Sequence, residues 1–284
     1  MKKIRNITFL IALVVTAFSC EKNVIEYDTT DVTGKAEFQL HYVVPVVAGA
    51  ANNIFKIEIN DQLYASSTSP LATYNAVPSG SVGRFYTTKV GENNIKLYKG
   101  DNLELVYDKN VTLTEGKQNV FVYDFNQPPV VIDNGFPYEA IVTDTTADLQ
   151  WVKFYNFLFE TEGVPTDLKL QYQYQYTVNN ETGEKSNWAN VGRAVSFGES
   201  TGWEVIPVNV TVEISSGTAR IDYRITAIDA GGNDLGILQV MNANNAFVNY
   251  ADWWTGNVGR RYHHIFAGMR AAKPTSAVRQ FTAL

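Results

Sequence analysis

Residues 198–202 read Gly-Glu-Ser-Thr-Gly, the spacing that in some hydrolases presents a nucleophilic serine on a tight strand-to-helix turn. Such a serine needs a histidine within hydrogen-bond reach. Here residues 203–210 continue as a predicted strand, not a helix, and His263 and His264 belong to another predicted strand. We therefore expect a glycine-rich hairpin loop at this position and no nucleophile at Ser200.

Two groups of side chains carry atoms that ligate metals. His263 and His264 are adjacent, and neighbouring residues of a strand point to opposite faces, so the pair cannot chelate one ion. We expect one of them to be packed and the other exposed. Asp229, Asn233 and Asp234 surround a Gly-Gly pair, but their spacing fits no EF-hand loop. An ordinary turn is favoured there, and the sequence predicts no metal and no cofactor.

Residues 250–256 form the most suggestive segment for binding, Tyr-Ala-Asp-Trp-Trp-Thr-Gly. An aromatic surface built from Trp253 and Trp254 would stack on sugar rings, with Asp252 and Tyr250 beside it as hydrogen-bonding groups. Asn242, Asn244, Asn245 and Asn249 are near in sequence and offer further amides. The alternative is that one tryptophan fills the core, as large aromatic side chains commonly do. Large exposed aromatic patches mark interaction surfaces, so carbohydrate or peptide binding stays open.

The N-terminus has the features of a secretory signal peptide: Lys2, Lys3 and Arg5 precede the apolar run ITFLIALVVTAF at 7–18. That run is too short to span a bilayer, which takes about 20 residues. The only cysteine of the chain, Cys20, follows Ser19 at the expected cleavage point, an arrangement that resembles a bacterial lipobox. The sequence therefore predicts a signal peptide at 1–19 and lipidation of Cys20.

Charge indicates how the processed chain meets its surroundings. Residues 1–19 carry three of the 23 Lys and Arg residues and none of the 29 Asp and Glu, so the processed chain has a formal charge of 20 − 29 = −9. An acidic protein of this kind is not expected to bind nucleic acid or to adhere to anionic lipid. We expect the acyl chains to provide the anchor, in the outer membrane of a Gram-negative bacterium on its periplasmic or external side.

Two short segments resemble an O-glycosylation acceptor of some Gram-negative anaerobes. They are Asp28-Thr29-Thr30 and Asp144-Thr145-Thr146, which make Thr29 and Thr145 the candidate acceptors. Both lie in predicted linkers, where an acceptor must be exposed. An ordinary polar turn explains them equally well.

The elements that position these residues are short strands. Apolar and polar residues alternate in 55–59, 94–98, 103–107, 168–176 and 219–228, with turn sequences between them, and no segment has the period of a long helix. This pattern predicts an all-β protein with two immunoglobulin-like or transthyretin-like β-sandwich domains. We expect a tether at 20–33, the first sandwich at 34–126, a Pro- and Gly-containing linker at 127–147 and the second sandwich at 148–284.

The two halves match in plan, which suggests a duplication: 35–45 with 149–159, 53–60 with 166–173, and 109–125 with 257–270. The run EFQLHYVVP, the hairpin KIEINDQLYAS and the closing strand NVFVYDF make the first half resemble the domain-of-unknown-function family 4397. That resemblance implies β-sandwich domains of bacterial surface lipoproteins, present here in two copies. It implies no catalytic residues.

The sequence thus predicts a non-catalytic, lipid-anchored envelope protein that acts as a binding, scaffold or adhesion module. The alternative is a glycan-binding accessory lipoprotein that uses Trp253 and Trp254. A hydrolase is the weakest alternative, because neither paired carboxylates nor a histidine-based triad stands in a recognisable setting. The partner, whether a glycan or an envelope protein, and the oligomeric state are left open by the sequence.

Overall fold

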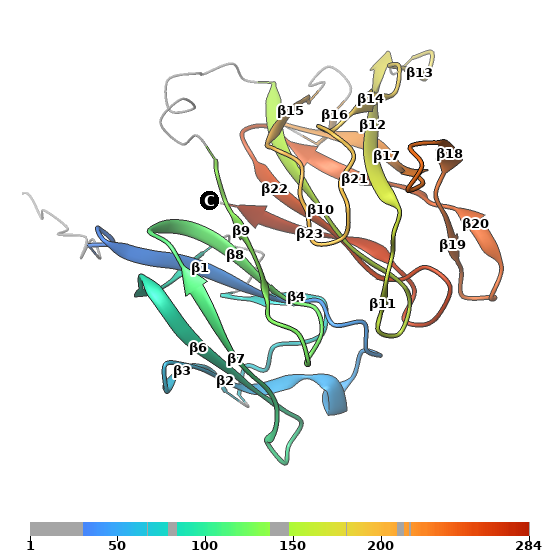
Figure 1. Cartoon of the computed structure of the whole chain (residues 1–284). Helices are drawn as coiled ribbons and strands as arrows, with labels where there is room; N and C mark the ends of the chain where they lie inside the picture. Colours follow the sequence, from blue (N-terminus) through green and yellow to red (C-terminus); the bar gives the residue numbers. More distant parts are fainter. Residues whose placement is uncertain are drawn as a thin grey trace, which may run out of the picture. The chain divides into compact units, whose positions relative to one another are not determined.

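The computed structural model describes residues 31–66, 68–78, 84–136, 148–179, 181–208, 213–215 and 217–283. Cys20, Thr29, Thr145 and the predicted signal peptide lie outside the described residues. Within them the chain forms strands, and its one helical element is a single 3₁₀ turn at Ala50–Asn52. The prediction of an all-β fold of the sandwich type is confirmed (Figure 1).

The first half of the chain folds into two sheets. Sheet A contains β4 (Asn75–Val77), β1 (Lys35–Tyr42), β8 (Gly116–Val122) and β9 (Val130–Asp133) in that order, and β5 (Tyr86–Lys89) pairs with the start of β1. Sheet B contains β3 (Gln62–Ala65), β2 (Ile54–Ile59), β6 (Gly91–Lys99) and β7 (Glu104–Leu113). Alternate residues of their strands, among them Leu40, Ile57 and Leu97, meet in one buried cluster.

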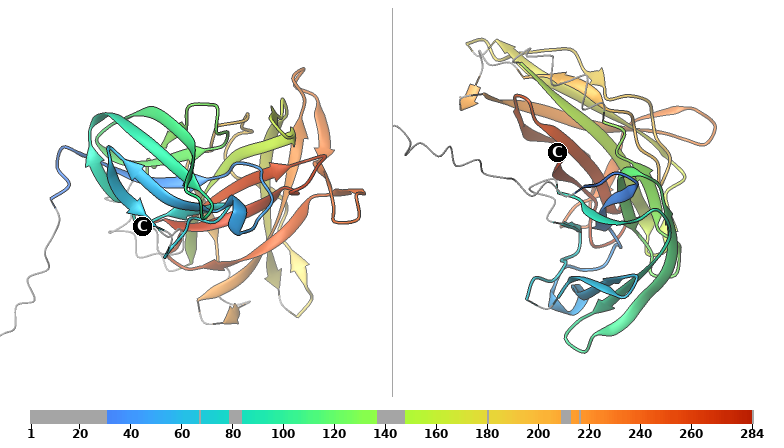
Figure 2. Two further views of the ribbon diagram at one scale, coloured as in Figure 1. Left: turned by 90° about the horizontal axis from the view of Figure 1, so that it is seen from below. Right: turned by 90° about the vertical axis from the view of Figure 1, so that its left-hand side faces the viewer.

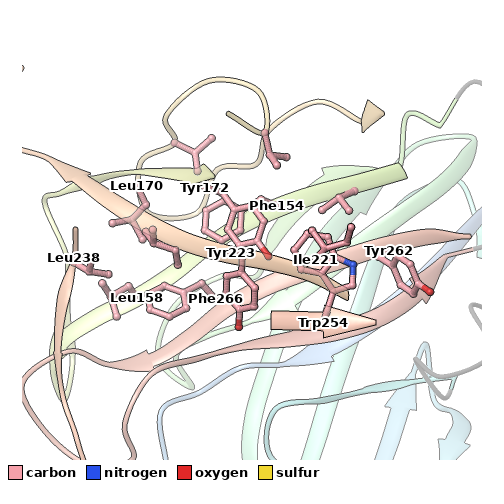
Figure 3. Packing of buried hydrophobic residues seen from close by; sticks show 14 of the residues in the cluster. Phe154, Leu158, Leu170, Tyr172, Ile221, Tyr223, Leu238, Trp254, Tyr262 and Phe266 are labelled. Carbon is pink, nitrogen blue, oxygen red and sulfur yellow. The ribbon is translucent and has the colours of Figure 1, made fainter. Parts of the chain in front are cut away.

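The second half repeats this plan with longer strands. Sheet C contains β11 (Val164–Pro165), β10 (Leu149–Thr161), β22 (Arg261–Met269) and β23 (Ala277–Ala283), and β15 (Glu204–Pro207) pairs with the start of β10. Sheet D is built on β12 (Lys169–Asn179) and β17 (Thr218–Ile228). Its further strands are β13 (Glu184–Lys185), β14 (Ala189–Asn190), β16 (Glu213–Ser215), β18 (Asp234–Ile237) and β21 (Ala251–Asn257). A hairpin of β19 (Gln239–Met241) and β20 (Phe247–Asn249) stands beside them. The inner faces of C and D enclose the largest buried cluster (Figure 3).

Several strand pairings of the first half recur in the second half in the same chain order. The opening strands β1 and β10 run parallel to β8 and β22, and each of these then pairs with an antiparallel last strand, β9 or β23. An isolated bridge joins Ile54 to Leu71 in the first half, and another joins Leu170 to Val195 at the matching point of the second. This shared topology is what the predicted duplication requires.

Sheets A and C also bury side chains against each other. A third cluster takes Phe121 from sheet A and Tyr155, Phe157, Ile265 and Phe281 from sheet C. The centroids of the Phe121 and Phe157 rings are 4.5 Å apart, and the rings are stacked. Sheet C is therefore covered on both faces, by sheet D and by sheet A, and residues Val32–Leu284 make up one compact unit.

The stretch predicted as a linker, 127–147, contains a strand in its described part. Val130–Asp133 form β9, which pairs antiparallel with β8 at the edge of sheet A. The apolar run Val130-Val131-Ile132 gives this strand side chains to bury, and Val131 packs on the first core while Ile132 packs on the cluster between sheets A and C.

Figures 1 and 2 show the first-half strands in blue to green and the second-half strands in yellow-green to red.

A glycine closes the contact between β22 and the segment before β23. Gly268 has φ 122°, and a Cβ placed on it would lie 2.6 Å from the Cα of Ser276. No side chain fits that approach, and the backbone conformation itself favours glycine. The turn that returns the chain to sheet C thus depends on this residue.

Candidate functional site

The serine motif is a loop, as predicted. Gly198 has φ 75°, Ser200 forms an isolated bridge with Tyr155, and the hydroxyl of Thr201 accepts a hydrogen bond from the backbone N–H of Phe154 at 2.9 Å. Ser200 forms no hydrogen bond with a histidine among the described residues. The strand β15, not a helix, follows the loop. The arrangement required for a nucleophilic serine is absent from this described segment.

His263 and His264 point to opposite faces of sheet C, as predicted, but the expectation that one is exposed is wrong. Nδ1 of His263 is 2.8 Å from the hydroxyl of Tyr155, and Nδ1 of His264 is 2.8 Å from the hydroxyl of Tyr172. Both rings are 1% exposed because sheet C is covered on both sides. Burial lowers the pKa of His264 to about 3, and it lowers the pKa of His263 well below its ordinary value. Both side chains are therefore neutral parts of the core.

The acidic loop after β17 is a turn. The carboxylate of Asp229 accepts hydrogen bonds from the backbone N–H and the side-chain amide of Asn233, at 2.8 and 2.9 Å. These bonds lower the pKa of Asp229 and use its oxygens within the loop. In the same way Asn242 accepts bonds from the backbone N–H groups of Asn244 and Ala246. No group of three or more His, Cys, Asp or Glu residues in the described ranges could hold a metal ion.

The structure separates the two tryptophans that the sequence grouped together. Trp254 is 5% exposed and packs with Tyr172 and Tyr223 inside the core of the second half, as Figure 3 shows. Its ring also contacts that of His264 in an edge-to-face arrangement. The hydroxyl of Tyr250 faces the same core, where it accepts a hydrogen bond from the backbone N–H of Val278. Trp253 points the other way and is 45% exposed. The prediction of one binding surface made of both tryptophans is therefore wrong, because successive residues of β21 lie on opposite faces of sheet D.

The outer face of sheet D is the strongest candidate binding surface. The register of β12, β17 and β21 aligns Gln175, Asp222 and Trp253 across three neighbouring strands. Gln173 lies beside Arg224 in the adjoining row, and Nε of Arg224 donates to the amide oxygen of Gln173 at 2.7 Å. Alternation points Ile221, Tyr223 and Ile225 into the core. The residues between them point outward, where Arg220 is exposed and Asp222 and Arg224 are half-buried.

A second indole belongs to this face. Trp188, just before β14, lies under the guanidinium of Arg224, with 4.3 Å from Cζ to the ring centroid. Its neighbour Asn190 accepts a hydrogen bond from the side chain of Gln173 at 2.9 Å. The guanidinium of Arg220, on β17, lies 4.8 Å from the ring centroid of Trp253, on β21. Each indole is thus held in place by an arginine from β17, with amide groups between the two.

Asp222 lies at the centre of this face. Its two carboxylate oxygens accept bonds from Nζ of Lys185 at 2.8 Å and from Nε of Arg220 at 2.7 Å. Partial burial would raise the pKa of Asp222, but the hydrogen bonds and charges of Lys185 and Arg220 outweigh it and lower the pKa. The carboxylate is therefore ionised and fully engaged with its two cations.

Of the residues on this surface, the sequence predicts only Trp253 as a binding residue. Trp188, Arg220 and Arg224 are not among the residues that it predicts for a site. A signal was present, because Gln171, Gln173 and Gln175 mark one side of β12 as polar. Asp252, the remaining residue predicted for the site, accepts a hydrogen bond from the backbone N–H of Trp253. Its position in β21 puts it on the side of sheet D opposite to Trp253.

No helix of the described part of the chain has the length and apolarity needed to cross a membrane. Comparison with known proteins finds no family model that matches the chain and no match among the curated proteins.

Proposed function

We propose that this chain is a non-catalytic, lipid-anchored envelope protein whose outer D face, defined as Gln173, Gln175, Trp188, Arg220, Asp222, Arg224 and Trp253, binds carbohydrate. The observation that carries the proposal is the combination of two indole rings with amide and guanidinium groups on one face of sheet D. Exposed aromatic rings on a folded protein mark interaction surfaces.

The chemistry of the face suits a sugar. The C–H groups of a pyranose ring pack on an indole, while its hydroxyls need hydrogen-bond donors and acceptors nearby. Gln173 and Gln175 carry both kinds of group, and the arginines carry donors in a fixed plane. Arg220 against one ring face also restricts the motion of Trp253, which reduces the ordering cost of binding.

The anchor in this proposal is the lipidated Cys20. Two or three acyl chains, each contributing about 0.8 kcal/mol per buried CH₂, hold a protein firmly where one chain does not. An acidic body gains nothing from anionic headgroups, so the lipid supplies the attachment. The proposed location is the outer membrane of a Gram-negative bacterium, and the resemblance of the first half to family 4397 agrees with it.

The anchor is tested by changing Cys20→Ser. The variant is expected to lose metabolic labelling by a fatty acid and to appear in the soluble fraction, because no thiol remains to carry the lipid. Cell fractionation and labelling of both forms measure this. A wild-type chain that takes up no fatty acid, or a variant that stays in the envelope fraction, contradicts the anchor.

The carbohydrate proposal is tested by changing Trp253→Ala in the lipidated chain held in detergent. Retention on a glycan array is expected to fall at least about fivefold, because one stacked ring is worth about 1 kcal/mol or more at a desolvated contact. Phe247→Ala is the matched control. Trp253 and Phe247 are 45% and 48% exposed, and each has an arginine against its ring, but Phe247 lies on β20, outside this face. Equal retention by all three proteins would rule out the proposed face.

A further inference from the structure

We propose that the ligand of the outer D face is an acidic oligosaccharide, one that carries carboxylate or sulfate groups. This inference rests on the proposed function and adds the chemical class of its ligand. It comes from an excess of cationic groups on this one face of a chain that has a formal charge of −6 overall.

The carboxylate of Asp222 is the only acidic group among the residues that define the face, and Lys185 at its edge adds a third cation to Arg220 and Arg224. Asp222 accepts from Lys185 and Arg220 together, so its charge is shared by two partners. One negative charge against three positive charges leaves an excess of two. An anionic ligand is attracted to such a face, and a neutral one gains nothing from it.

Arg224 is the group best prepared for an anion. Its Nε donates to Gln173, a neutral amide, and its guanidinium stacks on Trp188. Arg224 forms no ion pair within the described residues, and its two terminal nitrogens have no hydrogen-bond partner there. A planar guanidinium held by stacking and by one fixed bond presents those nitrogens as a fork, the geometry that binds carboxylate or sulfate oxygens in pairs.

Arg220 provides a second donor beside the exposed indole. Within the described part of the chain only its Nε is engaged, by Asp222, and its side chain is 51% exposed. Since its guanidinium lies against Trp253, an acidic group on a sugar stacked at that ring would come within reach of the terminal nitrogens of Arg220. Recognition of the ring and recognition of the charge would thus occur at one place.

The spacing of the two arginines indicates an extended ligand. Arg220 and Arg224 are four residues apart on β17 and share its outward side. At about 3.3 Å per residue their Cα atoms are roughly 13 Å apart. A single phosphate or monosaccharide reaches one of them, whereas an oligosaccharide with repeated acidic groups reaches both.

The test uses the lipidated chain in detergent on an array of neutral, uronate-containing, sialylated and sulfated oligosaccharides. The retained set is expected to be acidic. Methyl esterification of the carboxylates, or removal of the sulfates, of the most strongly retained glycan should weaken its binding at least about tenfold. Added NaCl should weaken binding of the acidic form, because exposed charges are screened.

Substitutions of single arginines test whether the charge on this face, and not a general loss of charge or of folding, determines binding. Arg224→Gln and Arg220→Gln are each expected to weaken acidic-glycan binding about tenfold, with Arg224→Lys intermediate because lysine keeps the charge but not the fork. Arg84→Gln makes the same charge change at an exposed position of the first half and should leave binding unaltered.

The outcomes distinguish this inference from the proposed function. If neutral and acidic glycans bind equally and Trp253→Ala abolishes both, carbohydrate binding stands and the acidic class is wrong. If no glycan is retained, both fail. If a single-stranded oligodeoxynucleotide binds as tightly as the best acidic glycan, the face is a general polyanion surface and the inference is overturned.

Discussion

Lowering the pH from 7.5 to 5 is expected to reduce the free energy of unfolding by at least about 4 kcal/mol. All three histidines of the chain, His41, His263 and His264, are buried and neutral. Burial lowers the pKa of His41 to about 4, although its bond to Asn119 acts the other way, and it lowers that of His264 to about 3. An unfolded histidine titrates near 6.5.

The sign follows from proton linkage. Between pH 6.5 and the lowered pKa the unfolded chain binds a proton that the folded chain does not, so stability is complete above pH 6.5 and falls as the pH falls. At about 1.4 kcal/mol per pH unit, His41 and His264 each contribute about 2 kcal/mol of loss by pH 5. His263 acts in the same direction. Its pKa is lowered mainly by burial, and the nearby His41 and Lys153 also disfavour its charged form.

Urea unfolding at several pH values measures this effect. The carboxylates with lowered pKa, such as Asp222 and Asp229, lose their contribution only at lower pH, so the range from 6.5 to 5 isolates the histidines. His41→Leu is the informative variant, because it should remove about 2 kcal/mol of the pH-dependent part whatever its effect at pH 7.5. A free energy of unfolding that is constant from pH 7.5 to 5 would contradict the buried placement.

Trp254→Ala is expected to lower the free energy of unfolding by about 3–5 kcal/mol, whereas Trp253→Ala lowers it by about 1 kcal/mol or less. Trp254 fills the core of the second half against Tyr172 and Tyr223, and its removal leaves a cavity in a close-packed interior. The Trp253→Ala substitution removes only an exposed ring and its contact with Arg220.

Chemical denaturation of the two variants alongside the unaltered chain checks this contrast. The same pair separates stability from binding, because Trp253→Ala should lose glycan retention while it stays folded. Comparable destabilisation by both substitutions would mean that sheet D does not have the inner and outer faces described here.

The sequence predicted local conformation well. Alternation in β17 identified which residues share a face, the adjacent histidines were assigned to opposite sides of a strand, and the loops at 198–202 and 229–234 were recognised as turns. These results depend on neighbours along the chain, and a period of two is a local property of extended backbone.

Whether one side of a strand is buried or exposed depends on which distant segments of the chain pack against it. The expectation of one exposed histidine assumed a sheet with a wet side, but sheet A covers the side of sheet C that sheet D does not. The face that holds Trp188, Arg224 and Trp253 could not be predicted from the sequence for the same reason. Its residues come from three separate segments that strand pairing brings together. The sequence by itself determined the strands, their alternation and the separation of neighbouring side chains. Only the tertiary structure decided which tryptophan is core and which is surface, because burial depends on the sheet that packs against a strand and not on the strand itself.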